Sequence, residues 1–158
     1  MVLSAPSMPQ VCHRLHELLG LLNTRLPLFS PAELAAFPGP GKWSRKQILG
    51  HLIDSAANNH QRFMLALTTP EPLVLTPYDQ DAWVRCADYQ HTLPADLLSL
   101  WTTYNRQLIR LIEQIPLTAH AHRCTYGNGY EVTLRWLIED YAVHLEHHVQ
   151  QILGRTPQ

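Results

Sequence analysis

The last helical segment of the chain reads TLRWLIEDYAVHLEHHVQQILG, from Thr133 to Gly154. On a helical wheel of about 100° per residue, its apolar side chains gather on the side of Tyr141. A stripe of this width is typical of a helix that packs on a hydrophobic core. Thr133 is a favourable residue at a helix start, and Gly154 suits the left-handed position after a helix end. The segment therefore predicts a long amphipathic helix. Its stripe consists of Leu134, Leu137, Ile138, Tyr141, Leu145, His148, Val149 and Ile152.

Proline residues separate three further helical patterns from one another. The first covers residues 10–26 and carries leucines at helical spacing. The second begins at Ser44, which has the capping-box spacing to Gln47, and runs to about residue 69. The third covers residues 93–115. Four amphipathic helices predict an all-α fold, a four-helix bundle, in one domain that spans residues 1–158.

The connections between these helices carry their own signals. Residues 27–41 read as loop, with one turn around Glu33. Residues 70–94 form a connection that is long for a structureless loop, so we expect a short helix near residues 79–86 or a functional role there. Asn128 and Gly129 form a strong hairpin signal, which predicts a short hairpin before the last helix.

Composition narrows the class of protein. The chain has 158 residues, of which 46% are hydrophobic and 16% charged, and this balance excludes a disordered or fibrous class. The net charge of -1 gives no reason to expect a nucleic-acid partner or an anionic membrane surface. No apolar stretch approaches the roughly 20 residues that span a bilayer, and the first residues do not resemble a signal peptide. We expect a cytoplasmic protein with no membrane partner.

Three histidines have positions that suit a metal site. His144 and His148 are one turn apart on the last helix, so both imidazoles can reach one point. The wheel places His148 near the middle of the buried stripe, His144 at its edge and His147 outside it. His51 lies at the edge of the apolar side of the second helix. These positions predict a three-histidine site, and the alternative is that each histidine is a hydrogen-bonded core residue.

Other residues give weaker signals. Ser55, Asn58 and Arg62 continue a polar line beside His51, and such a line favours a wet pocket over dry packing. His120 and His122 read as solvated loop residues. The zincin motif, the Glu-x-x-His motif of di-iron bundles, the P-loop and the G-x-S-x-G motif are all absent.

Two segments of the chain resemble a known family. Trp43-Ser44 followed by residues 47–55, QILGHLIDS, resembles the second-helix signature of the DinB-like superfamily, and Tyr141 to His148 resembles its last helix. The segments Arg62-Phe63, Ala66-Leu67, Pro77-Tyr78-Asp79 and Trp83 are similar to its YfiT-like branch, a group of candidate metal-dependent hydrolases. The resemblance covers about residues 40–153.

The resemblance implies an up-down-down-up bundle that binds one divalent metal ion, nickel or zinc, through His51, His144 and His148. It also implies a homodimer. Three neutral imidazoles leave the metal charge and at least one coordination position free, as in catalytic sites. A hydrolase would use metal-bound water on a small-molecule substrate. The alternatives are a metal-dependent transferase of a low-molecular-weight thiol, and a non-catalytic, metal-stabilised binding module.

Several neighbours of the three histidines are candidates for supporting roles. Asp54 and Asp140 are placed to orient the imidazoles through their second nitrogen, or they are solvated helix carboxylates. Arg62 is placed to hold an anionic group of a substrate, or it forms an ordinary salt bridge. Asn58 and Tyr78 are candidate pocket residues.

Overall fold

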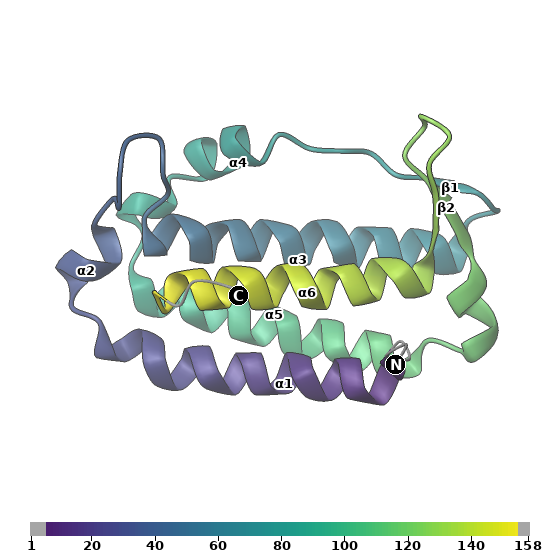
Figure 1. Ribbon diagram of the computed structural model, residues 1–158, viewed down its shortest axis with the longest axis horizontal. Helices are drawn as coiled ribbons and strands as arrows, with labels where there is room; N and C mark the ends of the chain where they lie inside the picture. Colours follow the sequence, from purple (N-terminus) through teal and green to yellow (C-terminus); the bar gives the residue numbers. More distant parts are fainter. Residues whose placement is uncertain (1–5, 155–158) are drawn as a thin grey trace, which may run out of the picture.

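A computed structural model describes residues 6–154 as a bundle of four long helices (Figure 1). These are α1 (Met8–Arg25), α3 (Arg45–Thr68), α5 (Pro94–Gln114) and α6 (Leu134–Ile152). Two short elements, η1 (Leu26–Leu28) and α2 (Pro31–Ala35), connect α1 to α3. The predicted four-helix bundle is confirmed.

The helix starts follow the capping signals of the sequence. The Ser44 Oγ accepts a hydrogen bond from the Gln47 N–H, and the Gln47 side chain accepts one from the Ser44 N–H. Thr133 accepts a hydrogen bond from the Trp136 N–H in the same way at the start of α6. Gly154 follows α6 with a φ of +70°, a conformation that glycine adopts without strain.

The four long helices have the predicted up-down-down-up directions. Figure 1 shows α1 and α6 running one way and α3 and α5 running the other way. α1 packs against α5 and α6, and α3 packs against the same two helices. Since α3 and α5 are neighbours and parallel, the chain between them must return along the length of the bundle.

This return is the long connection that the sequence predicts after residue 69. It contains β1 (Leu73–Val74), α4 (Gln80–Ala87) and η2 (Tyr89–His91). The short helix expected near residues 79–86 is therefore present. The α4 and η2 segments pack against α3, so they cover a face of this helix that would otherwise meet solvent.

A small sheet lies at the other end of α3. β2 (Arg123–Thr125) and β3 (Glu131–Thr133) form the antiparallel hairpin that the Asn128-Gly129 pair predicts. β1 adds to β2 in parallel, with Leu73 opposite Cys124. β1 has no signal in the sequence, because two residues are too few to show strand periodicity.

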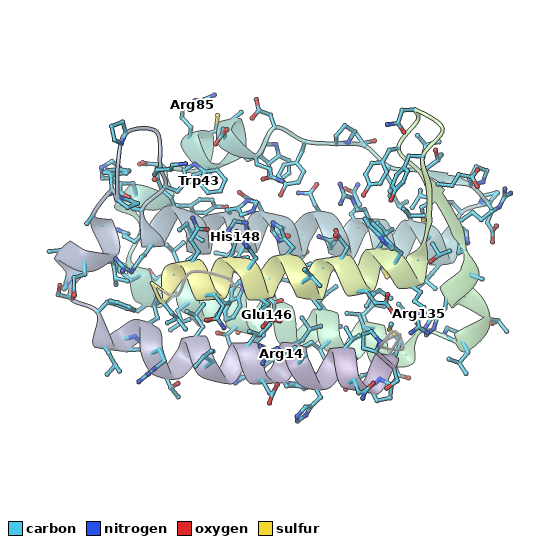
Figure 2. The ribbon with its side chains drawn as sticks, in the orientation of Figure 1. Arg14, Trp43, Arg85, Arg135, Glu146 and His148 are labelled. Carbon is cyan, nitrogen blue, oxygen red and sulfur yellow. The ribbon has the colours of Figure 1, made fainter. Side chains whose placement is uncertain are left out.

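The core fills the centre of the bundle. Trp101, Tyr141 and Phe63 are its largest fully buried side chains. Tyr141 donates a hydrogen bond to the Asn105 Oδ1, so its buried hydroxyl is satisfied. Arg14 of α1 and Glu146 of α6, labelled in Figure 2, form an ion pair beside the core. Within residues 6–154, no helix has the length and apolar character needed to cross a bilayer.

The prediction that His120 and His122 are solvated is wrong. The turn η3 (Leu117–Ala121) packs against α6, and His120 is buried with no hydrogen-bond partner for its Nε2 among the described residues. The His122 side chain is only 12% exposed, and its Nδ1 lies 3.5 Å from the Glu71 Oε1. The prediction fails because it treats this segment as an exposed loop, whereas the packing of η3 on α6 buries these side chains.

Candidate metal centre

His51 lies in a stretch of α3 that is covered on every side. All residues from Ile48 to Ala56 are buried, and the His51 side chain is completely inaccessible. The helical wheel places His51 at the edge of the apolar face, and its complete burial means that the covered surface of α3 extends past this edge. A wheel counts only the face toward the bundle, whereas α4 and η2 pack on α3 as well.

His51, His144 and His148 converge on one point between α3 and α6. The Nε2 atoms of His51 and His144 are 3.1 Å apart. The ring centroid of His148 lies 4.7 Å from that of His51 and 4.6 Å from that of His144. One nitrogen from each ring lies within 4.8 Å of the other two, and no other group of three potential metal ligands is this close within residues 6–154.

His148 is half-buried, not central in the buried stripe as the wheel places it. Figure 2 shows its side chain between the α3 and α6 ribbons, on the side of the bundle that carries Trp43. Its Nδ1 lies 2.9 Å from the Gln151 Oε1. His147 is exposed, as predicted. The site is thus closed on the His51 side and accessible on the His148 side.

Burial keeps all three imidazoles neutral. Burial and the neighbouring His148 lower the pKa of His51 to about 4. Burial, together with the other histidines, lowers the pKa of His144 to about 3, and burial lowers the pKa of His148 as well. Neutral imidazoles at neutral pH carry lone pairs that can bind a metal ion.

The donor set fits a divalent metal ion. Imidazole nitrogen is a good ligand for zinc, nickel and copper. Two nitrogens bound to one tetrahedral zinc ion at its usual bond length lie about 3.3 Å apart, which is close to the 3.1 Å between His51 and His144. No carboxylate or thiol joins the three histidines within the described chain.

Ser55 orients His144. Its Oγ lies 3.3 Å from the His144 Nδ1, the ring nitrogen that does not face His51. Asp140, the residue expected in this role, is exposed and makes no hydrogen bond to His144 within residues 6–154. The sequence held a signal for Ser55, since it lies four residues after His51 and therefore on the same face of α3. The Trp43 ring packs on His51 with a centroid distance of 4.9 Å.

Asp54 is buried about one turn of α3 after His51 and is held by Tyr89. The Tyr89 hydroxyl donates a 2.6 Å hydrogen bond to the Asp54 Oδ1, and the Oδ2 has no partner within residues 6–154. Burial raises the pKa of Asp54, and the Tyr89 hydrogen bond partly opposes this effect. Sequence reasoning missed Tyr89, although a glycine inside α3, at Gly50, marks the place where its ring approaches the helix.

Three other predicted pocket residues share one cavity. Asn58, Arg62 and Tyr78 line a cavity of about 370 Å³ between α3 and the returning connection, together with Trp83. Burial and the nearby Asp54 raise the pKa of Tyr78 to about 12, whereas Arg62 opposes the rise. Along α3, Asn58 and Arg62 lie about 10 and 16 Å from His51, at the rise of an α-helix.

Comparisons with known proteins agree with this description. A family model described as the DinB superfamily matches residues 11–152. A protein of Halalkalibacterium halodurans named "Putative metal-dependent hydrolase" is 31% identical over 117 residues, which cover 72% of this chain and 67% of the relative. A protein of the same name in Bacillus licheniformis is 33% identical over 114 residues, which cover 71% of this chain and 64% of the relative. The chain therefore spans about two thirds of the length of these relatives.

A solved structure shows the same fold. YfiT from Bacillus subtilis, described as "a probable metal-dependent hydrolase with an unusual four-helix bundle topology", matches with a TM-score of 0.85 and 23% identity. The match covers 98% of this chain and 90% of YfiT. Because the family model reaches from the first turn of α1 to the last residue of α6, the chain belongs to the DinB superfamily.

Proposed function

We propose that the chain binds one divalent metal ion, nickel or zinc, through His51, His144 and His148, and that it hydrolyses a small-molecule substrate. One observation carries the proposal: the three imidazoles converge on a single point from two helices. The names of the relatives support hydrolysis as the reaction. The alternative is a binding module in which the metal only stabilises the bundle. Such a structural site would need a fourth protein ligand, and within residues 6–154 no fourth ligand joins the three histidines.

A divalent ion held by His51, His144 and His148 would act as a Lewis acid and would lower the pKa of a coordinated water to about 7. The protein residues keep the three imidazoles neutral and oriented. Burial beside Trp43 holds His51 dry, and the Ser55 hydroxyl fixes the ring of His144. These contacts preorganise the nitrogens before a metal binds.

The neighbouring cavity provides a place for the substrate. We propose that Arg62 binds an anionic group and that Asn58 and Tyr78 contact the body of the substrate. Arg62 makes no ion pair or hydrogen bond within residues 6–154, so its guanidinium is available. Asp54, with one carboxylate oxygen unpartnered, is placed to hold a proton near the site.

The first experiment measures metal content after purification and dialysis against nickel or zinc. We expect roughly one ion per chain in the wild type. His148→Ala should lose most of it, because it removes one of three ligands. His147→Ala is the matched control, since His147 is adjacent, exposed and outside the group. Equal metal content in the two variants would contradict the proposed ligand set.

A second experiment tests the reaction. The metal-loaded wild type and His148→Ala are compared on a panel of esters and amides, and on electrophiles supplied with a low-molecular-weight thiol. Hydrolysis that is lost with His148 supports the proposal. Turnover that requires the thiol would show that the protein is a thiol transferase. Bound metal without any turnover would favour the non-catalytic binding module.

The identity of the metal, the homodimer and the cytoplasmic location are further predictions, and each has its own test. Competitive loading with equimolar nickel and zinc tests the identity of the metal. Sedimentation analysis tests the homodimer, and fractionation of the producing cell tests the cytoplasmic location.

A further inference from the structure

A second cavity lies on the opposite side of the bundle from the histidines. α1 and α5 border it, whereas the histidines lie between α3 and α6. Its volume is about 580 Å³, within the range of small-molecule sites in proteins. None of the three histidines and none of their neighbours described above lines it.

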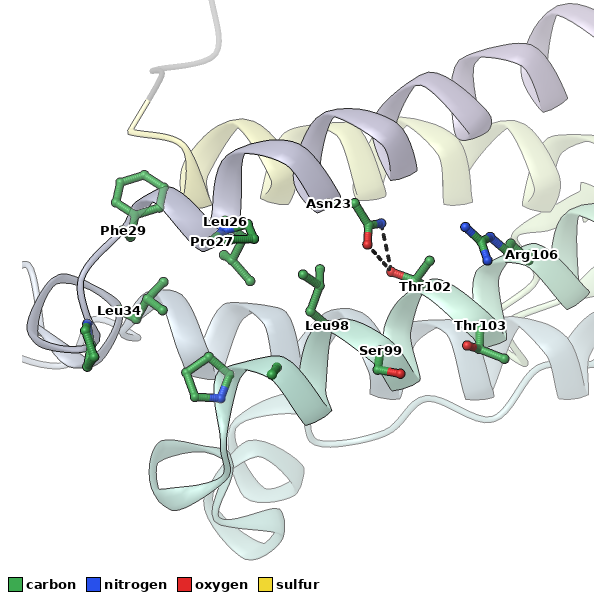
Figure 3. A pocket seen from close by; sticks show the side chains of 13 residues that line it. Asn23, Leu26, Pro27, Phe29, Leu34, Leu98, Ser99, Thr102, Thr103 and Arg106 are labelled. Atoms are coloured by element: carbon green, nitrogen blue, oxygen red, sulfur yellow. Dashed lines mark hydrogen bonds between the residues drawn. The ribbon is translucent and has the colours of Figure 1, made fainter.

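Most of this cavity is apolar. Leucine side chains from three elements meet at one end, where a proline inside η1 and prolines at the first positions of α2 and α5 stiffen the surrounding backbone. Figure 3 shows Leu26, Leu34 and Leu98 gathered there, together with Phe29. An apolar ligand segment bound at this end would remove hydrophobic surface from water.

The middle of the cavity holds one polar pair that is already satisfied. The Asn23 Nδ2 donates to the Thr102 Oγ1 at 2.9 Å and also lies 2.8 Å from the carbonyl oxygen of Leu19. Figure 3 shows this pair between the leucines and Arg106. Because the two side chains are hydrogen-bonded to each other, an apolar ligand segment beside them would leave few of their polar atoms without a hydrogen-bond partner.

Arg106, an exposed residue, lies at the other end of the cavity (Figure 3) and carries a positive charge. Its guanidinium points toward the gap between α1 and α5 (Figure 3), and it makes no ion pair or hydrogen bond within residues 6–154. Among residues 6–154, no aspartate or glutamate lines the cavity, and Arg106 is the one charged residue that does. Arg106 and Leu98 are two helical turns apart, about 12 Å along α5.

We propose that this cavity binds a carboxylate with an unbranched apolar tail, such as a medium-chain fatty acid. The carboxylate pairs with the planar guanidinium of Arg106, which matches it with two parallel hydrogen bonds. The tail runs past the Asn23–Thr102 pair and ends among Leu26, Leu34 and Leu98. This site is separate from the proposed metal centre and does not depend on it.

Calorimetric titration with decanoate, in the presence of a metal chelator, tests the proposal. The chelator prevents the carboxylate from binding a metal at the histidines. Arg106→Gln should weaken decanoate binding by about tenfold or more, because it removes a charge-assisted pair. The matched control is Arg110→Gln, one turn further along α5, exposed and outside the cavity. It should bind like the wild type.

Two ligand series complete the test. Binding should tighten with each added methylene from hexanoate to decanoate, by up to roughly fourfold per group. Decanol and decylammonium, which lack the negative charge, should bind much more weakly than decanoate. His148→Ala should bind decanoate like the wild type. A loss of metal binding can therefore be distinguished from a loss of decanoate binding at the Arg106 cavity.

Three outcomes would overturn the proposal. The first is equal affinity for decanoate and decanol, and the second is an unchanged affinity in Arg106→Gln. The third is self-association through the cavity, visible as concentration-dependent shifts of the Leu26 and Leu98 methyl resonances without ligand. That result would assign the cavity to a second copy of the chain.

Discussion

Gly50 shows how one residue of α3 determines the position of its neighbour. A Cβ at this position would lie 2.0 Å from the Tyr89 Cδ2 and 2.1 Å from the Tyr89 Cγ, well inside contact distance. The ring therefore rests directly on the backbone of α3, where its hydroxyl reaches Asp54. A glycine inside a helix costs about 1 kcal/mol relative to alanine, and here the close approach of Tyr89 requires it.

Gly50→Ala should destabilise the protein by about 1–3 kcal/mol, because the added methyl group displaces the whole Tyr89 ring. The control is Gly20→Ala in α1, where a Cβ meets nothing within 4 Å. It should stabilise the protein by about 0.5–1 kcal/mol through helix propensity alone. Urea unfolding monitored by circular dichroism measures both changes. A Gly50→Ala variant as stable as the wild type would refute the packing described here.

At the scale of elements, the cap of α3 makes a hydrogen bond beyond its own helix. Ser44 caps α3 and is completely buried. Its Oγ also donates a 2.6 Å hydrogen bond to the Gln90 Oε1, and the Gln90 side chain donates to the carbonyl oxygen of Ala35. The cap therefore joins the start of α3 to α2 and to η2, which packs on α3.

Ser44→Ala should lower the free energy of unfolding by about 2–3 kcal/mol, the sum of a lost cap and a buried acceptor left without its donor. Ser30→Ala is the matched control, because Ser30 accepts the same 3.2 Å bond from the Glu33 N–H but is exposed. It should cost about 0.5–1 kcal/mol. Chemical denaturation measures the free energy of unfolding of both variants. Equal decreases in the two variants would show that the hydrogen bond from Ser44 to Gln90 does not contribute to stability.

At the scale of the whole molecule, the three histidines join two helices that are far apart in the sequence. His51 belongs to α3, whereas His144 and His148 belong to α6. A metal ion bound by all three would bind the folded chain far better than the unfolded one. Binding of this kind stabilises the fold in proportion to the logarithm of the free metal concentration.

Added zinc or nickel at about 100 times its dissociation constant should raise the free energy of unfolding by about 2.7 kcal/mol. For a chain of this length, the melting temperature should rise by about 5–10 °C. His147→Ala should show the same rise, and His148→Ala should show little of it. Thermal melts with metal and with chelator measure the difference. A rise of the same size in His148→Ala would mean that the metal binds elsewhere.

The sequence by itself determined the helices and the identity of the candidate ligands. Capping residues, prolines and apolar periodicity are local signals, so they predicted α1, α3, α5 and α6 to within a few residues of their observed ends. The hairpin followed from an equally local signal, the Asn128-Gly129 pair, whereas the short helix α4 was expected from the length of the connection over residues 70–94. The spacing of His144 and His148 is also local, since one helical turn separates them.

Only the tertiary structure decided what surrounds these residues. The contacts that decide these surroundings join segments that are 35 to 93 residues apart in the sequence. They are the contact of His51 with His144, the hydrogen bonds from Tyr89 to Asp54 and between Ser55 and His144, and the pairing of β1 with β2. The physical reason is that a helical pattern specifies one buried face, whereas the returning connection buries the other face of α3. Contacts made by that connection leave no periodic trace in the sequence.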